Sequence, residues 1–249
     1  MRGLRLEFFK ARRKKLWLAP ACMLVIELIW SMWAMGRMDA EDLRQGWMYF
    51  LYQFPMLNTI LIPITTAVLA SRLCDMEHKG QTLKLMDTLC PPGRLFDAKF
   101  LCGAVYLGAA CVLQVLAIFC AGAVAGFRGG FPAGAYAFYF ISTLAVSLTL
   151  YLLQLVLSLN LVNQAPPLIA GVVGGFLGLF SMFFPRPVQR LVPWCYYAVL
   201  SPVGMNWDPA TRWTEFYWMP RDCVSLAVAA LAFGALYAAG RRLFARKEV

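Results

Sequence analysis

Charged side chains are scarce in this sequence. They make up 14% of its 249 residues, whereas soluble domains carry about a quarter. Apolar side chains reach 61%. One helical crossing of a bilayer needs roughly 20 apolar residues, so six crossings would use about half of the chain and leave little for a soluble domain. The composition therefore predicts one polytopic, all-α membrane domain over residues 1–249.

The sequence also lacks the motifs of common active sites. It has a single histidine, His78, and no HExxH, GxSxG or GxxxxGK[ST], which argues against zinc proteolysis, serine–histidine hydrolysis and nucleotide binding. The eight cysteines form no CxxC pair and no zinc spacing, although a disulfide between Cys195 and Cys223 stays open. We expect no catalytic residue, metal or cofactor in this chain.

Ionisable groups are rare in the expected spans. Glu27 lies near the middle of one, and Asp222 stands at the edge of another. A carboxylate in a membrane is costly unless it faces protein or water. Glu27 is therefore either a contact for a cationic substrate or partner helix, or a hydrogen-bonded or protonated group inside the bundle. With so few such groups, the energy for any transport is expected to come from elsewhere.

The basic residues are unevenly distributed. The net charge is +10, but most lysines and arginines lie in residues 1–15, 72–99 and 241–249. This clustering argues against a nucleic-acid surface, and the positive-inside rule places these segments and both termini in the cytoplasm. Residues 1–15 place apolar side chains on one helical face and basic ones on the other, which predicts an amphipathic helix on the membrane lipid. A disordered basic tail is the alternative.

Six apolar segments are expected to cross the membrane. They are residues 16–35, 50–73, 100–126, 134–159, 166–184 and 222–240. The first is long for a signal sequence and has no small-residue cleavage site, so we expect it to be retained. The second carries the polar Asn58. The fifth repeats glycine at small-xxx-small spacing, which allows close helix packing.

Two longer connections separate these spans. The loop 74–99 contains a predicted short helix at 81–89, which ends before a Pro-Pro-Gly run because proline cannot continue it. It is either a docking element for a soluble partner or a plain solvated loop. In the outer connection 185–221, residues 191–205 are apolar but too short to cross. We expect a re-entrant or interfacial hairpin there, followed by an exposed loop at 206–220.

Three aromatic residues of that hairpin are expected at the level of the lipid headgroups, where such side chains are common. They are Trp194, Tyr196 and Tyr197. Together with Glu27 and Asn58, they form a hypothetical substrate pathway.

The inner loop, residues 74–99, also carries a family pattern, E-x-K-G-x-T-x-K-x-x-x-T-L-x-P-x-x-R-x-x-x-x-K. Its residues are Glu77, Lys79, Gly80, Thr82, Lys84, Thr88, Leu89, Pro91, Arg94 and Lys99. With the basic start and six spans, it resembles the ABC-2 type transporter permeases. The PW-x-YY-x-x-x-x-P segment from Pro193 to Pro202 and the chain length are most similar to the lantibiotic (bacteriocin) immunity and bacitracin-resistance permeases.

The resemblance implies a type V ABC exporter-like fold with an elbow helix at 1–15, a cytoplasmic coupling helix and an outer re-entrant segment. It implies a separate ATPase subunit in two copies, which binds ATP and Mg, and a second permease chain, identical or a sister subunit. It implies export of an amphipathic peptide or lipid-like compound across the bacterial plasma membrane. The ATPase-coupling residues would be Glu77, His78, Lys79, Gly80, Gln81, Thr82, Leu83 and Lys84.

Two other functions remain open at this point. The chain is alternatively a stand-alone secondary transporter or membrane enzyme that uses Glu27, Asn58 and Asp222. It is alternatively a membrane scaffold without transport. An ATPase that copurifies with the chain would favour the permease, and activity of the chain alone in liposomes would favour the secondary transporter or enzyme.

Overall fold

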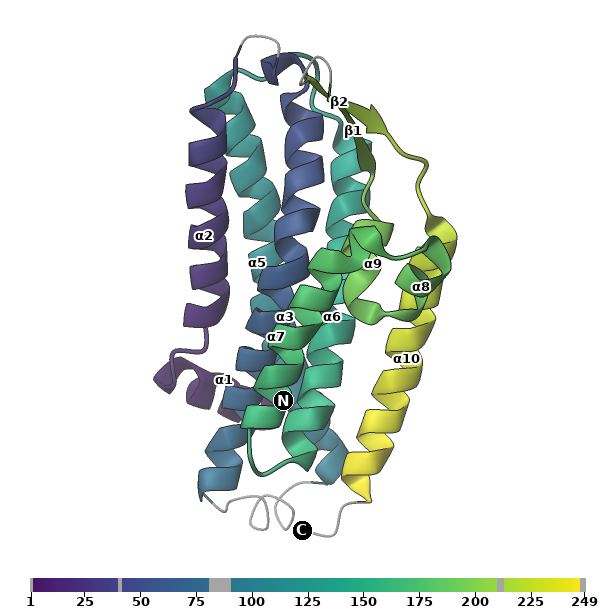
Figure 1. The fold of residues 1–249 in the computed structure, drawn as a ribbon. Coiled ribbons are helices and arrows are strands. Elements are labelled where there is room, and N and C mark those ends of the chain that lie inside the picture. Colours follow the sequence, from purple (N-terminus) through teal and green to yellow (C-terminus); the bar gives the residue numbers. More distant parts are fainter. Residues whose placement is uncertain (1, 40–41, 81–90, 210–212, 247–249) are drawn as a thin grey trace.

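The computed structural model describes residues 2–39, 42–80, 91–209 and 213–246, and Figure 1 shows a bundle of long helices with a small β-hairpin at one end. The long helices are α2 (Leu18–Met35), α3 (Gly46–Gly80), α5 (Pro92–Ala125), α6 (Ala133–Asn160) and α10 (Cys223–Ala245). The shorter elements are α1 (Arg2–Arg13), η1 (Asp42–Arg44), α7 (Ala165–Leu179), η2 (Phe180–Phe183), α8 (Arg186–Leu191), η3 (Pro193–Cys195), α9 (Tyr196–Val199), β1 (Val203–Asp208) and β2 (Trp213–Trp218).

Five helices in the described part of the chain are long and apolar enough to cross a membrane, and α7 is a shorter apolar helix. The chain is therefore a helical membrane protein, but the fifth expected span, 166–184, is not one full helix. With 15 residues, α7 rises about 22 Å, short of a hydrocarbon core of about 30 Å. Figure 1 shows α7 ending part-way along the bundle, where α8 and α9 lie.

Two helices extend beyond the expected spans. The second span was expected to end at residue 73, but α3 continues to Gly80, because Glu77 is paired by Lys10 and Lys99 of other helices and Lys79 pairs with Asp75 one turn before it. The third span was expected to begin at residue 100, but α5 begins at Pro92. Proline is favourable in the first turn of a helix, where no amide donor is needed. The expected helix at 81–89 lies outside the described residues.

Helix α1 lies across the lower part of the bundle, at an angle to α2 (Figure 1). The turn between them is fixed by the amide of Leu16, which donates to the Ala11 carbonyl at 3.1 Å, and by that of Lys15, which donates to Arg12 at 3.2 Å. Lys15 has φ 51°. This is a Schellman motif with lysine at the usual glycine position. Ala11 and Leu16 are both buried, so the turn presses α1 against the bundle.

The glycines of α7 allow it to pack closely on both sides. A Cβ atom at Gly171 would collide with the Ala67 side chain of α3, and one at Gly174 would collide with the Trp194 indole. The expected packing role of these glycines therefore agrees with the contacts. Through them, α7 connects α3 to the segment before the β-hairpin.

The outer connection 185–221 differs from the expected loop in two ways. Residues 206–220 were expected to form an exposed loop, but β1 and β2 pair antiparallel, with Val203 opposite Trp218 and Asp208 opposite Trp213. The side chain of Phe216 turns inward onto Tyr49, with ring centroids 5.5 Å apart. Thr214 and Phe216 of β2 are half-buried, whereas Glu215 and Tyr217 between and after them are exposed, as expected where one face of a strand is covered.

The tyrosines expected at the level of the lipid headgroups are buried between helices rather than exposed. Tyr196 and Tyr197 are buried in a core cluster with α3, α5, α6 and α10 residues, and Trp194 is half-buried against α7. Their hydroxyl groups have internal partners: Tyr196 donates to the Arg190 carbonyl at 2.9 Å, and Tyr197 lies 3.1 Å from the Ser147 hydroxyl. The polar tips of both tyrosines are therefore satisfied inside the protein, as is usual for buried tyrosines.

Candidate functional site

The predicted coupling residues begin at the last turn of α3, at the end of the bundle that also holds α1, the start of α5 and the end of α10 (Figure 1). We call this the basic end and the opposite one the hairpin end. Glu77, His78, Lys79 and Gly80 are described there, and Gln81, Thr82, Leu83 and Lys84 lie outside the described residues.

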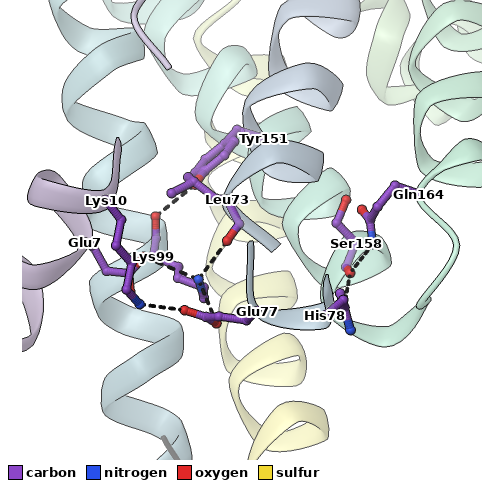
Figure 2. Close-up of polar contacts among 9 residues, drawn as sticks. All are labelled: Glu7, Lys10, Leu73, Glu77, His78, Lys99, Tyr151, Ser158 and Gln164. Carbon is purple, nitrogen blue, oxygen red and sulfur yellow. Dashed lines mark hydrogen bonds and ion pairs between the residues drawn. The ribbon is translucent and has the colours of Figure 1, made fainter. Parts of the chain in front are cut away.

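Four charged side chains form a closed ring at the basic end (Figure 2). The Nζ atom of Lys10 lies 3.0 Å from Glu7 Oε1 and 2.9 Å from Glu77 Oε1. The Nζ atom of Lys99 lies 3.3 Å from Glu7 Oε2 and 2.9 Å from Glu77 Oε2. Each carboxylate therefore contacts both lysines, each through a different oxygen. The charges cancel, and α1, α3 and α5 are joined.

Three of the four ring residues are almost fully removed from solvent, and Lys10 is 24% exposed. The side chains of Glu7 and Lys99 have 0% exposure and that of Glu77 has 2%. An ammonium has three donors, and besides the two carboxylates Lys99 contacts the Leu73 carbonyl at 2.8 Å. Burying charges is costly unless they are paired with good geometry. The ring meets this condition only while α1, α3 and α5 stay together, and only in part, because Glu77 Oε2 has no well-aligned hydrogen bond among the described residues despite its 2.9 Å ion pair with Lys99.

A tyrosine on α6 forms a hydrogen bond with the backbone of Lys99. The Tyr151 hydroxyl donates to the Lys99 carbonyl at 2.8 Å, and its ring is fully buried. It packs on Gly103, where a Cβ atom would overlap the phenol ring. The absence of a side chain at Gly103 therefore lets α6 approach α5 beside the ring of four charged residues.

The neighbouring residues of α3 have other partners. His78 Nε2 lies 3.1 Å from the Ser158 carbonyl near the end of α6, which also accepts from the Gln164 amide at 3.1 Å (Figure 2). Lys79 pairs with Asp75 at 2.8 Å and is 79% exposed. Among the coupling residues that the structure describes, Glu77 is therefore buried, whereas Lys79 and Gly80 face outward.

A further ion pair brings the last helix to the same end. Arg241 Nε on α10 lies 3.0 Å from Asp97 Oδ1 on α5, and the Tyr237 hydroxyl donates to the same oxygen at 2.7 Å. The end of α3 is thus surrounded by polar contacts to α1, α5 and α6, while α10 is joined to α5.

The sequence motif contained two of the four ring residues, Glu77 and Lys99, and the structure brings them together. It missed Glu7 and Lys10. Glu7 is the single acid among the seven basic residues of 1–15, and it lies on the same buried face of α1 as Ala11. An isolated acid on the apolar face of a basic helix was the available signal, because such a charge needs a cationic partner.

A second polar cluster lies inside the bundle. Asn58 donates to the Tyr139 hydroxyl at 2.9 Å, Tyr139 donates to Gln114 Oε1 at 2.7 Å, and Gln114 returns a bond to Asn58 Oδ1 at 2.9 Å. These residues join α3, α5 and α6. The Gln114 side chain also lies beside Glu27 on α2, although neither carboxylate oxygen of Glu27 has a hydrogen-bond partner with good geometry among the described residues.

The third residue of the alternative hypothesis, Asp222, lies elsewhere. Asp222 caps α10, accepting from the Ser225 amide at 2.9 Å and its hydroxyl at 2.7 Å, and pairs with Arg190 at 3.0 Å. These bonds hold the pKa of its carboxyl below the ordinary value. Cys195 and Cys223 are both free thiols. In the described part of the chain, no three His, Cys, Asp or Glu side chains are grouped as a metal site requires.

A cavity of about 260 Å³ opens near the hairpin end, between α3, the end of α7 and the hairpin. Met56, Val203 and Met219 give it apolar walls, and Arg186, Ser181 and Gln189 give it polar ones. The three aromatic residues of the expected substrate pathway, Trp194, Tyr196 and Tyr197, are not among its lining residues.

Comparison with protein families identifies the family of the chain. The model of a protein family described as "ABC-2 family transporter protein" matches residues 3–178. This range includes all four residues of the ionic ring and ends within α7. No curated protein matches the chain.

Proposed function

The chain belongs to the ABC-2 family of transporter proteins, and from this premise we propose that it works as a permease with a separate ATPase subunit that docks at the basic end. The family assigns the chain to the membrane component of a transporter. A partner must supply the energy, since the chain carries no GxxxxGK[ST] motif for the phosphates of ATP. Two ATPase copies, with their ATP and Mg, and a second permease chain would complete the transporter.

The observation that carries the docking proposal is the arrangement at the end of α3. Lys79 and Gly80 face outward there, and residues 81–84 follow them directly. One turn inward, Glu77 is held by Lys10 and Lys99. A partner bound to the outward residues therefore acts on a helix end that is joined by charge to α1 and α5.

This arrangement suggests how ATP binding would act on the spans. The helix α3 is continuous from Gly46 to Gly80, with Pro55 and Pro63 in its interior, so a displacement at Gly80 would be transmitted toward the hairpin end with bending at these two prolines. At mid-length it packs on the α7 glycines, and α7 in turn contacts Trp194. Movement of the coupling region would thus reach the cavity at the hairpin end. This requires two conformations of the permease that the ATPase binds with different affinity.

We further propose that the cargo is an amphipathic peptide, of the lantibiotic or bacteriocin type, or a lipid-like compound, exported across a bacterial plasma membrane with both termini cytoplasmic. The cavity with Met56, Met219 and Arg186 supports this, since it combines apolar walls with a cation. The alternative of a secondary transporter or enzyme is less favoured, because Asp222 caps α10 and pairs with Arg190 rather than joining Glu27 and Asn58.

The proposal is tested by pulling down the tagged full chain from its native membranes in mild detergent, with mass spectrometry of the bound proteins. The test variant is Lys79→Ala/Leu83→Ala/Lys84→Ala, which leaves the buried ring intact. The control is Arg128→Ala/Arg186→Ala/Leu191→Ala, which removes two cations and one leucine at the hairpin end.

We expect an ATP-binding subunit with the native chain and the control, and its loss from the test variant. No ATPase with any of the three chains would overturn the proposal. Activity of the chain alone in liposomes would favour the secondary transporter instead.

A further inference from the structure

A second feature of the basic end is a cleft between α1 and the last turns of α3. Its volume is about 730 Å³, and five cations line it: Lys10, Arg13, Lys14, Arg72 and Lys79. The acids in its wall are Asp75 and Glu77. This cleft lies outside the proposed cargo route, although two of its lining residues, Lys79 and Gly80, also belong to the proposed docking region.

The cations outnumber the acids that balance them. Lys79 is paired with Asp75, and Lys10 belongs to the neutral ring. Arg13, Lys14 and Arg72 are exposed, and no carboxylate in the described part of the chain forms an ion pair with them. The cleft therefore presents an excess of positive charge, which suits a compact anion such as a phosphate.

The surroundings of the cleft indicate where that phosphate comes from. Arg13 stacks on the Phe9 ring, with its guanidinium carbon 4.9 Å from the ring centroid. Phe9, Leu6 and Trp17 are exposed by 56%, 41% and 50%. The span α2 begins directly after the fixed turn that follows α1. These cations therefore stand beside exposed apolar side chains at the start of a span, which is where lipid headgroups lie.

We infer that this cleft binds the phosphate headgroup of an anionic phospholipid, while the exposed apolar side chains of α1 and Trp17 contact its acyl chains. Lys10 lines the cleft and also contacts both acids of the ring. The bound headgroup would therefore add a contact between α1 and α3 next to the ring, so that lipid binding and the position of α1 are coupled.

The test uses the purified full chain in detergent, titrated with phosphatidylglycerol or phosphatidylcholine and followed by native mass spectrometry. The variant Arg13→Gln/Arg72→Gln removes two cations of the cleft. Arg128→Gln/Arg221→Gln removes two exposed arginines elsewhere, with the same change of net charge. Arg13→Lys/Arg72→Lys keeps the charge and reports on folding.

We expect phosphatidylglycerol to bind the native chain more tightly than phosphatidylcholine. The cleft variant should bind it roughly 10–30-fold more weakly, since each cation near an anionic surface contributes about 1 kcal/mol. The control pair and the lysine pair should keep most of the affinity.

Three results would overturn the inference. Equal loss in the cleft variant and the control would indicate general charge attraction rather than a site. Displacement of the lipid by millimolar inorganic phosphate would indicate a site for free phosphate. Loss of the lipid whenever a copurified protein subunit is bound would identify the cleft as a protein-docking surface.

Discussion

Replacing Lys99 by methionine removes one cation from the ring and leaves the volume of the side chain nearly unchanged. The variant loses contacts to Glu7, Glu77 and the Leu73 carbonyl. Lys10 then faces two buried carboxylates alone, which leaves one uncompensated negative charge. Breaking a buried ion pair from one side costs about 3–5 kcal/mol.

This loss should appear as a lower melting midpoint. At about 2–4 °C per kcal/mol for a chain of this size, Lys99→Met should lower the midpoint by roughly 6–20 °C, measured by size-exclusion chromatography of heated detergent samples. Lys79→Met is the matched control. Its ion pair with Asp75 is exposed, so its effect should stay within about 1 kcal/mol.

A double variant tests the charge argument itself. Lys99→Met/Glu77→Gln removes one charge of each sign and leaves Glu7 paired with Lys10. Its melting midpoint should therefore lie above that of Lys99→Met, by the equivalent of about 1–3 kcal/mol. If the two losses simply add, the ring is not a coupled unit and the reasoning is refuted.

Three further predictions concern other parts of the bundle. Gly103→Ala should lower the melting midpoint by the equivalent of about 1–3 kcal/mol because the new methyl group displaces Tyr151, whereas Gly108→Ala, with open space around it, should be neutral or stabilising; equal effects would contradict this packing. Glu27→Gln should keep or raise the midpoint, since neither carboxylate oxygen has a well-aligned partner among the described residues; a marked fall would show that the charge is used. Hydrogen bonds lower the pKa of Asp222 in the folded protein, so its stabilising effect is present above about pH 4 and lost as the pH falls through the folded pKa; the midpoint of Asp222→Asn should therefore depend less on pH in this range, and an unchanged pH profile would contradict the assignment.

Some of the architecture follows from composition and spacing alone. Long apolar runs predicted the membrane class, and the structure has five helices of the required length and composition. The fifth expected span shows the limit of this reasoning. The apolar run 166–184 is long enough, but Pro185 stops the helix pattern, the last residues form a 3-10 turn, and the chain folds back toward Trp194. A hydropathy profile does not predict that turn.

The ionic ring was predicted only in part, for a physical reason. Polar residues after Leu73 were interpreted as a loop because charges normally seek water. Here Glu77 is buried because Lys10 lies across from it, and these two residues are separated by 67 positions in the sequence. Local periodicity reports on the face of one helix, whereas a buried ion pair depends on where other helices place their charges. The family pattern included Lys99, but it did not include the two ring residues on α1, Glu7 and Lys10.

The most direct test of the account is photo-crosslinking in native membranes, from a benzoylphenylalanine placed either at Lys79 on the basic end or at Trp207 on the β-hairpin. Both side chains are exposed. The account predicts an adduct with an ATP-binding subunit from position 79 and none from position 207. An ATPase adduct from the hairpin position, or none from position 79 while a copurified ATPase is present, would contradict docking at the end of α3.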